Sequence, residues 1–213
     1  MKVATEIQRP LDRQDEFKAP KRGIRLLDIP PHAFVMIDGE GAPLPAAFEA
    51  RMPGLYGTAY GLRFALKAHG VEGKVGPLEG LWWTTDGVTY EEALLDAARE
   101  SWRWTLMIAL PPEATAEEVA LHLETARTRL HPSLTPGLRT EVFAEGACAQ
   151  LMHIGPYEEE GPTIERLHAG IEAEGLHPVG RHHELYLGDP RRSAPEKLRT
   201  ILRQPVVASV RVS

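Results

Sequence analysis

Near the end of the chain stands the segment Gly180-Arg181-His182-His183-Glu184-Leu185-Tyr186-Leu187-Gly188. Apolar and polar residues alternate between its two glycines, which is typical of a short β-strand. The alternation places Glu184 on the same face as His182 and Tyr186, with the leucines on the other face. A carboxylate between apolar strand positions needs a partner or a ligand, because burying an unpaired charge is costly. The simplest alternative is an exposed, salt-bridged Glu184 beside aromatic residues of the core.

The composition is that of a globular protein with a hydrophobic core. The chain has 213 residues, of which 43% are apolar and 25% are charged. This length suits one large domain or two fused modules of about 100 residues each. The net charge of −6 gives no electrostatic support for a nucleic-acid partner. The single cysteine, Cys148, excludes an intramolecular disulfide, and no apolar run reaches the ~18 residues of a membrane span. We therefore expect a cytoplasmic protein without a membrane or nucleic-acid partner.

The first half of the chain predicts one strand, one helix and two further strands. The polar residues 1 to about 30 are expected to form an N-terminal arm, followed by a strand over 33–38. A helical repeat of apolar residues follows, at Leu55, Ala59, Leu62 and Leu66. Beside it runs an aromatic stripe, expected to lie in the core with one ring lining a pocket as the alternative: Tyr56, Tyr60 and Phe64. Strands are expected over 78–83 and 102–108.

The second half repeats this plan after a connector helix over 113–131. We expect a strand over 147–154, a helix from near Pro162 to Gly175, and the strand 181–187. The spacing of Ser193 and Glu196 matches a capping box and predicts a helix through about Leu202, before a last strand over 206–212. The order strand–helix–strand–strand therefore occurs twice. It predicts an α+β fold of two tandem modules, 31–110 and 139–213.

An alignment of the two modules assigns a face to each central strand. With Leu81 placed on Leu185, Trp82 corresponds to Tyr186 and Gly80 corresponds to Glu184. We expect the leucine face to pack against the helices and the opposite face to line a groove between the modules. One wall then offers an acid and a phenol, and the other offers an indole beside a glycine that leaves space. Such a site suits a flat aromatic or cationic organic ligand.

Four segments in this order resemble one known family: Leu78–Trp83, Cys148–Tyr157, Glu159–Glu165 and His182–Pro190. They resemble the stand-alone GyrI-like small-molecule-binding proteins, and the resemblance extends from about residue 20 to the end of the chain. It implies the same tandem-module fold. In multidrug-sensing regulators that carry this domain, a buried glutamate meets aromatic, often cationic drugs, and Glu184 is the matching position. The subgroup that the sequence resembles most is implicated in the hydrolysis of cyclopropanoid genotoxins.

The resemblance implies roles for individual residues. Opening a spirocyclopropyl dienone needs a water molecule directed at the ring methylene and a donor at the developing phenolate. Glu184 would orient or deprotonate the water as the main catalytic group, and Tyr186 is the second catalytic candidate, with Tyr157 or a histidine as alternatives at the oxygen. Trp82 would stack on the planar ligand. The full set of ligand-binding candidates is Trp82, Gly80, Tyr157, Tyr60, Trp104 and His182.

Other kinds of site find little support. Adjacent residues of a strand point to opposite faces, so His182, His183 and Glu184 do not predict a metal site. No phosphate-binding loop, nucleophile elbow or dinucleotide fingerprint is present, and we expect no cofactor. The acidic run Glu158–Glu160 is expected to be a solvated loop. A DNA-binding unit is not expected, so regulation of transcription is not supported.

Two alternatives to hydrolysis stay open. A non-catalytic protein could bind or sequester drugs in the same groove. A module that inhibits DNA gyrase by contact is also known in the family, but Glu184 and Trp82 would then have no purpose.

Overall fold

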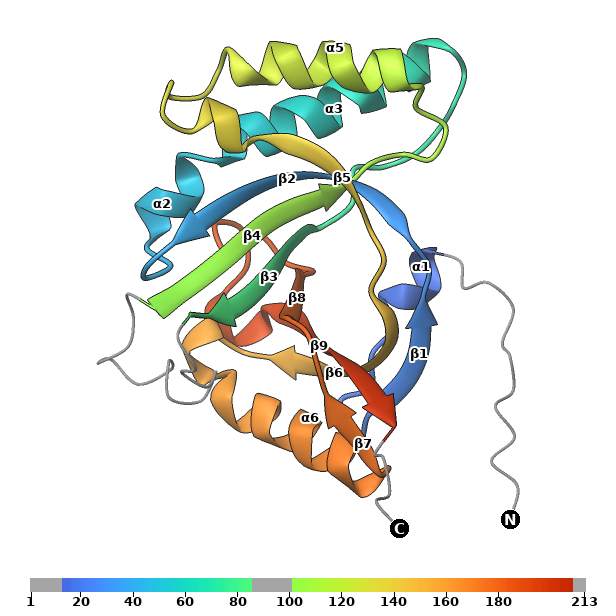
Figure 1. Ribbon diagram of the computed structural model, residues 1–213, viewed down its shortest axis with the longest axis vertical. Helices are drawn as coiled ribbons and strands as arrows, with labels where there is room; N and C mark the ends of the chain where they lie inside the picture. The colour runs from blue at the N-terminus through green and yellow to red at the C-terminus, as the bar shows by residue number, and fades with distance from the viewer. Residues whose placement is uncertain (1–12, 86–100, 209–213) are drawn as a thin grey trace.

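A nine-stranded antiparallel sheet carries the fold in the computed structural model, which describes residues 13–85 and 101–208 (Figure 1). Its strands run in the order β1-β6-β9-β8-β3-β4-β2-β5, and β7 pairs with β9. Their bounds are β1 Arg25–Ile29, β2 His32–Glu40, β3 Leu78–Thr84, β4 Trp102–Ala109, β5 Arg139–Phe143, β6 Gly146–Ile154, β7 Leu176–Pro178, β8 His182–Tyr186 and β9 Arg199–Ala208. The helices are α1 Arg13–Glu16, α2 Pro45–Glu49, α3 Met52–Ala68, α5 Ala116–Arg127 and α6 Gly161–Ala173. In the described part of the chain, no helix has both the length and the hydropathy needed to cross a membrane.

The fold repeats one module, as the sequence predicts. The first copy is β2–α3–β3–β4 and the second is β6–α6–β8–β9. The copies meet where β3 pairs with β8, and Gly80 lies opposite Glu184 in that pair. On either side of this pair the strands follow in the same order, β4 then β2 and β9 then β6. A pseudo-two-fold axis therefore passes between Gly80 and Glu184. The α+β class and the tandem duplication are both confirmed.

Both sets of helices cover the same face of the sheet. Paired residues of antiparallel strands share a face, so Trp82 lies on the face of Glu184 through the β3–β8 register. Trp82 belongs to the cluster that α3 and α5 pack against, and Leu202, which pairs with Glu184, packs against α6. In Figure 1, α3 and α5 lie at the top of the sheet and α6 at the bottom. The residues at the β3–β8 junction lie between the two helical layers.

This arrangement corrects the expected assignment of faces. Leu81 was expected to pack against the helices, but it packs with Phe34, Met36 and Met107 on the opposite face. The central strands are buried on both faces, so alternation separates the faces without showing which one the helices cover. Aromatic side chains, rather than the leucines, supply the surface under α3.

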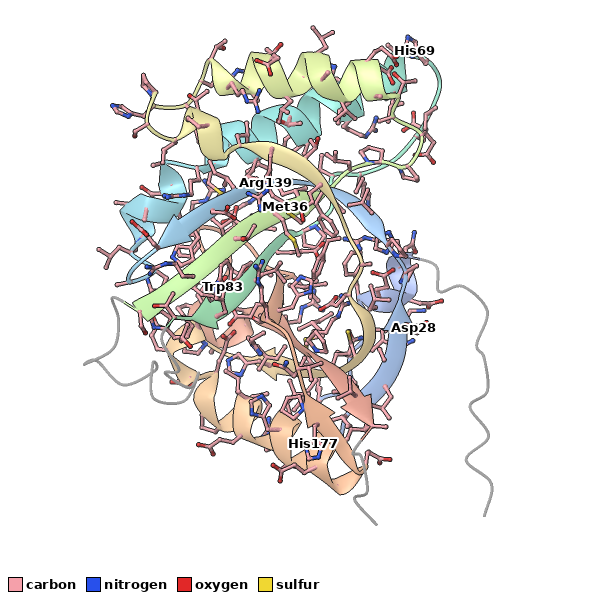
Figure 2. All side chains as sticks on the ribbon, viewed as in Figure 1. Asp28, Met36, His69, Trp83, Arg139 and His177 are labelled. Atoms are coloured by element: carbon pink, nitrogen blue, oxygen red, sulfur yellow. The ribbon has the colours of Figure 1, made fainter. Side chains whose placement is uncertain are left out.

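The opposite face is enclosed by curvature of the sheet. Strand β1 pairs with β6 at one edge, yet only Pro30 and Pro31 separate it from β2 in the other module. A similarly short link joins β5 to β6. The two edges must therefore approach each other, and in Figure 1 the chain that leads from β5 to β6 descends on the side where β1 lies. Side chains fill the enclosed space, including that of Met36 (Figure 2).

One predicted helix is wrong. The segment expected to be helical through Leu202 forms a 3₁₀ turn over Pro195–Lys197 and then enters β9. Pairing with both β6 and β8 overrides the local capping signal. Arg203 and Pro205 hid this strand, because a buried arginine and a proline seldom occur within a central strand. Residues 209–212 of the predicted last strand lie outside the described residues.

The stretch expected to be an arm also contributes to the fold. It supplies β1, which pairs with β6, and α1, which packs near the enclosed face. Its sequence is too polar and irregular to predict either element. Strand β5 was likewise not expected, since it follows a short loop after the connector helix and pairs only with β2.

Candidate functional site

The centre of the site is a chain of hydrogen bonds that joins three residues of β3 and β8. The indole Nε1 of Trp82 donates to the hydroxyl oxygen of Tyr186 over 3.2 Å. The Tyr186 hydroxyl donates in turn to Oε2 of Glu184 over 2.8 Å. Glu184 is 6% exposed and Tyr186 is half-buried. The sequence-predicted Glu184, Tyr186 and Trp82 therefore lie together, and Glu184 is not on open surface.

Trp82 is held by other aromatic rings. Its ring lies 5.7 Å from Trp102 in an edge-to-face arrangement and 6.0 Å from Phe48. Trp104 stacks on Phe48 at 4.8 Å and is itself 0% exposed. Trp104, a candidate ligand contact, therefore has no surface to offer a ligand in this structure. Its ring lies 6.3 Å from that of Trp82 in a tilted arrangement, and packing of this kind fixes the indole orientation.

Gly80 provides room at the pseudo-two-fold axis. A Cβ atom at this position would lie 2.9 Å from the Tyr186 hydroxyl oxygen and 3.0 Å from Nε1 of Trp82. The space that the glycine leaves is thus occupied by the hydrogen bond between these two side chains. A side chain at this position would therefore disturb the chain of hydrogen bonds that joins Trp82, Tyr186 and Glu184.

His182 shares the face and the neighbourhood of Glu184. Its Nε2 lies 3.6 Å from Oε1 of Glu184, and the side chain is almost completely buried. Burial, with smaller contributions from His168 and His183, lowers the pKa of His182 to about 3. His182 is therefore neutral at physiological pH and places no positive charge beside Glu184.

The loop before α6 brings a phenol and a second acid to the site. The ring of Tyr157 meets that of Tyr186 edge-on at 5.6 Å. Burial, Glu160 and Glu184 raise the pKa of Tyr157 to about 12. Burial and the charge of Glu184 raise the pKa of Glu160 well above its usual range, so that this carboxyl group is protonated at neutral pH. The pKa of Tyr186 is raised in the same way, first by burial and then by Glu184.

Glu160 is the residue that the sequence analysis missed. Glu158 and Glu159 are exposed as expected for a solvated loop, but Glu160 is 5% exposed. Its position was readable from the spacing, because it stands four residues before Ile164 on the buried stripe of α6. A residue on that stripe points towards the sheet even when it is acidic.

Tyr60 does not belong to the group around Glu184. It stacks between Tyr56 and Phe64 on α3, with ring centroids 6.0 and 6.2 Å apart. Tyr60 is 48% exposed and Phe64 is 67% exposed, so the prediction that this stripe is core is wrong for both. A helix buries one stripe against a sheet, and in α3 that stripe is the one that begins at Leu55.

The enclosed face of the same strands carries a different cluster of charges. His183 lies between two carboxylates, with Nδ1 2.8 Å from Glu145 and Nε2 3.1 Å from Glu79. Arg203 donates from Nη1 to Glu145 over 2.8 Å, and Arg13 pairs with Glu79 at 2.5 Å. These acids are paired with cations, of which Arg203 is buried and Arg13 is partly exposed. They are therefore parts of the structure rather than a free reactive group.

The face of β3 and β8 that carries Trp82, Glu184 and Tyr186, which we call the site face, combines the elements needed to polarise a bound molecule. A buried acid is fixed by a tyrosine hydroxyl, an aromatic ring stands beside it, and a second acid nearby keeps its proton. Such a pair can accept a proton at one carboxyl group and supply one at the other.

Comparisons with known proteins show the family and the fold of the chain. Residues 23–206 match the family model described as the GyrI-like small molecule binding domain. An uncharacterized conserved protein from Listeria innocua is 34% identical, with 91% of this chain and 97% of that chain covered and a TM-score of 0.77. A hydrolase from Listeria innocua is 33% identical, with 91% and 96% covered and a TM-score of 0.71.

A more distant match shows the fold alone. The C-terminal domain of EcmrR is 10% identical, with 87% of this chain and 98% of that chain covered and a TM-score of 0.54. A comparison with curated proteins finds no significant match.

Proposed function

The chain belongs to the family of GyrI-like small-molecule-binding domains, and from this premise we propose that it binds flat aromatic molecules between its modules and hydrolyses cyclopropanoid compounds. The observation that carries the proposal is the buried Glu184, held by the hydroxyl of Tyr186 beside the ring of Trp82. A similar protein described as a hydrolase supports the catalytic part.

In the proposed reaction, Glu184 directs a water molecule at the methylene carbon of a spirocyclopropane. The water oxygen forms a bond to that carbon, and the bond from the methylene to the spiro carbon breaks. The released electron pair enters the dienone ring, which becomes an aromatic phenolate. Glu184 takes a proton from the attacking water. Once the phenolate oxygen has gained a proton and Glu184 has given one up, the net change is the addition of one water molecule.

Tyr186 and Trp82 prepare the acid for this step. Because the pKa of Tyr186 is raised, its hydroxyl keeps its hydrogen and donates it to Glu184. This hydrogen bond holds the Glu184 carboxylate in a fixed direction. Fixing both reacting groups before reaction removes much of the entropic barrier. The indole face of Trp82 would hold the planar part of the ligand.

Product analysis tests the proposal. The substrate is a spirocyclopropyl cyclohexadienone fused to a flat aromatic system, incubated with wild type, Glu184→Gln and Glu172→Gln. We expect wild type to give a product heavier by one water, and Glu184→Gln to be slower by about 100-fold or more. Glu172 is exposed on α6, so its variant should match wild type. Equal rates for Glu184→Gln would remove Glu184 from the chemistry, and binding without product would leave only a binding function.

A further inference from the structure

Glu160 is a buried acid for which residues 13–85 and 101–208 offer no salt-bridge partner. It is the N-cap residue of α6, directly after the 3₁₀ turn Tyr157–Glu159. The side chain is 5% exposed, and its Oε1 has no hydrogen-bond partner among residues 13–85 and 101–208. Glu160 makes no salt bridge within the same ranges. A polar atom buried in this way calls for a ligand or a functional reason.

In the described part of the chain, the groups that act on the charge of Glu160 come from three elements, and none of them is a cation. Glu184 and Tyr186 approach from β8, the Thr200 hydroxyl from β9, and Glu158 and Tyr157 from the turn before α6. The two glutamates repel a charge on Glu160, and the Thr200 hydroxyl only partly opposes this effect. Glu160 is thus neutral while Glu184 stands beside it, an arrangement in which two acids take different roles.

We propose that Glu160 is a second catalytic residue, which donates its proton to the ligand oxygen while Glu184 activates water. The proposal rests on the proposed ring-opening function. The bond changes are those given above, and the phenolate oxygen takes the proton of the Glu160 carboxyl group. At the end of the step Glu160 is ionised and Glu184 is protonated. Return of one proton from Glu184 to Glu160, directly or through water, restores the starting state.

Glu160 is better suited to this role than the two phenols of the site. The Tyr186 hydroxyl accepts a hydrogen bond from Trp82 and donates its own hydrogen to Glu184, so this hydrogen is not directed at a ligand. Tyr157 has a pKa of about 12 and is a weaker acid. A neutral carboxyl group donates to an oxygen acceptor and offers no charge to a cation. Glu160 therefore favours ligands that present a conjugated carbonyl oxygen to its proton.

Glu160→Gln tests the proposal, with Glu158→Gln as its control. Glutamine keeps a hydrogen-bond donor at the site but cannot give up a proton. We expect Glu160→Gln to lower kcat for the spirocyclopropyl dienone by about 100-fold or more with little change in KM. Glu158 is exposed in the same loop, so its variant should keep the wild-type kcat. Denaturation curves of both variants show whether they are folded.

The outcomes separate this proposal from the function on which it rests. If wild type does not open the ring, the proposed function fails and the role of Glu160 fails with it. If wild type is active and folded Glu160→Gln keeps its kcat, only the role of Glu160 is overturned.

A spectroscopic readout adds evidence that a purely structural role would not give. Infrared spectra of wild type at neutral pH should show the carbonyl band of a protonated carboxylic acid. That band should be absent from Glu160→Gln, kept in Glu158→Gln, and shifted when the ring-opened phenol is added. A wild-type spectrum without the band would overturn the proposal.

Discussion

Buried acids lie on both faces of the sheet at β3 and β8, and the partners of these acids and the directions of their pKa shifts differ between the two faces. On the enclosed face, Glu79 and Glu145 are paired with Arg13, His183 and Arg203, and the pKa of Glu145 falls to about 2 because of His183 and Arg203, although burial acts against this. On the site face, Glu184 accepts from a tyrosine, and burial beside Glu184 raises the pKa of Glu160.

The difference distinguishes acids whose charge is compensated by cations from the acids to which we assign a role in catalysis. A compensated buried charge stabilises a particular packing, whereas an acid without a counterion is tolerated where chemistry needs it. Two neighbouring residues in the sequence lie on these two different faces, since His183 pairs with Glu79 and Glu145 whereas Glu184 accepts from Tyr186. The predictions below test that separation.

The largest expected effect is on stability and comes from the enclosed face. Arg203→Met removes the cation that binds Glu145, Gln150 and a backbone carbonyl of α1. Because it leaves a buried carboxylate with less compensation, we expect the free energy of unfolding to fall by about 3–5 kcal/mol. Chemical denaturation measures this change.

An exposed arginine provides the control. Arg191 pairs with Asp189 at 3.0 Å, but its side chain is 82% exposed. We expect Arg191→Ala to leave the unfolding curve unchanged, because exposed pairs are screened by water. If both variants had the same small effect, the enclosed cluster would not be holding the fold.

A smaller effect on stability should follow pH. The pKa of His183 is raised by Glu145 and Glu79 against the effect of burial. Its contribution is therefore complete below its ordinary pKa of 6.5 and is lost as pH rises through the higher value in the folded protein. The lowered pKa of Glu145 acts in the opposite direction. Its contribution is present above 4.5 and is lost as pH falls towards about 2.

Denaturation over a range of pH values checks both limbs. Wild type should be most stable between them and should lose stability on either side. In His183→Gln the alkaline limb should flatten, and the acid limb should become smaller, because Arg203 is then left to lower the pKa of Glu145 without His183. An unchanged alkaline limb in that variant would show that His183 is not the group that titrates.

The smallest expected effect lies on the site face. Trp82→Phe keeps an aromatic ring but removes the N–H that donates to Tyr186. One hydrogen bond of this kind contributes about 1 kcal/mol, so we expect a decrease in kcat/KM of about fivefold. Steady-state kinetics on the spirocyclopropyl dienone measure it. A loss as large as that of Glu184→Gln would mean that Trp82 has a direct role in the chemistry.

Local sequence patterns predict the duplication of the module and the residues at its centre. Period-two alternation identified β8, and the alignment of Leu81 with Leu185 placed Gly80 and Glu184 at equivalent positions. The structure puts these two residues opposite each other across the pseudo-two-fold axis. Such information is local, since it depends only on spacing within each strand.

The other features of the fold and of the site depend on contacts between segments that are distant in the sequence. The capping signal at Ser193 was outweighed by pairing of β9 with two strands. The faces of β3 could not be distinguished by pattern, because both are buried. Glu145, His183 and Arg203 meet only when the sheet curves, so no spacing in the sequence predicts their cluster. The position of Glu160 on the buried stripe of α6 predicts that its side chain points towards the sheet, but it does not predict that Glu184 lies nearby.

The most direct test compares Glu184→Gln with Glu145→Gln, using unfolding free energy and ring-opening rate as paired readouts. Both substitutions remove one buried carboxylate without changing its size. We predict that Glu145→Gln loses about 3 kcal/mol or more of stability. Glu184→Gln should stay as stable as wild type and lose about 100-fold or more in rate. Equal destabilisation by the two variants, or a wild-type rate for Glu184→Gln, would contradict the separation of the two faces.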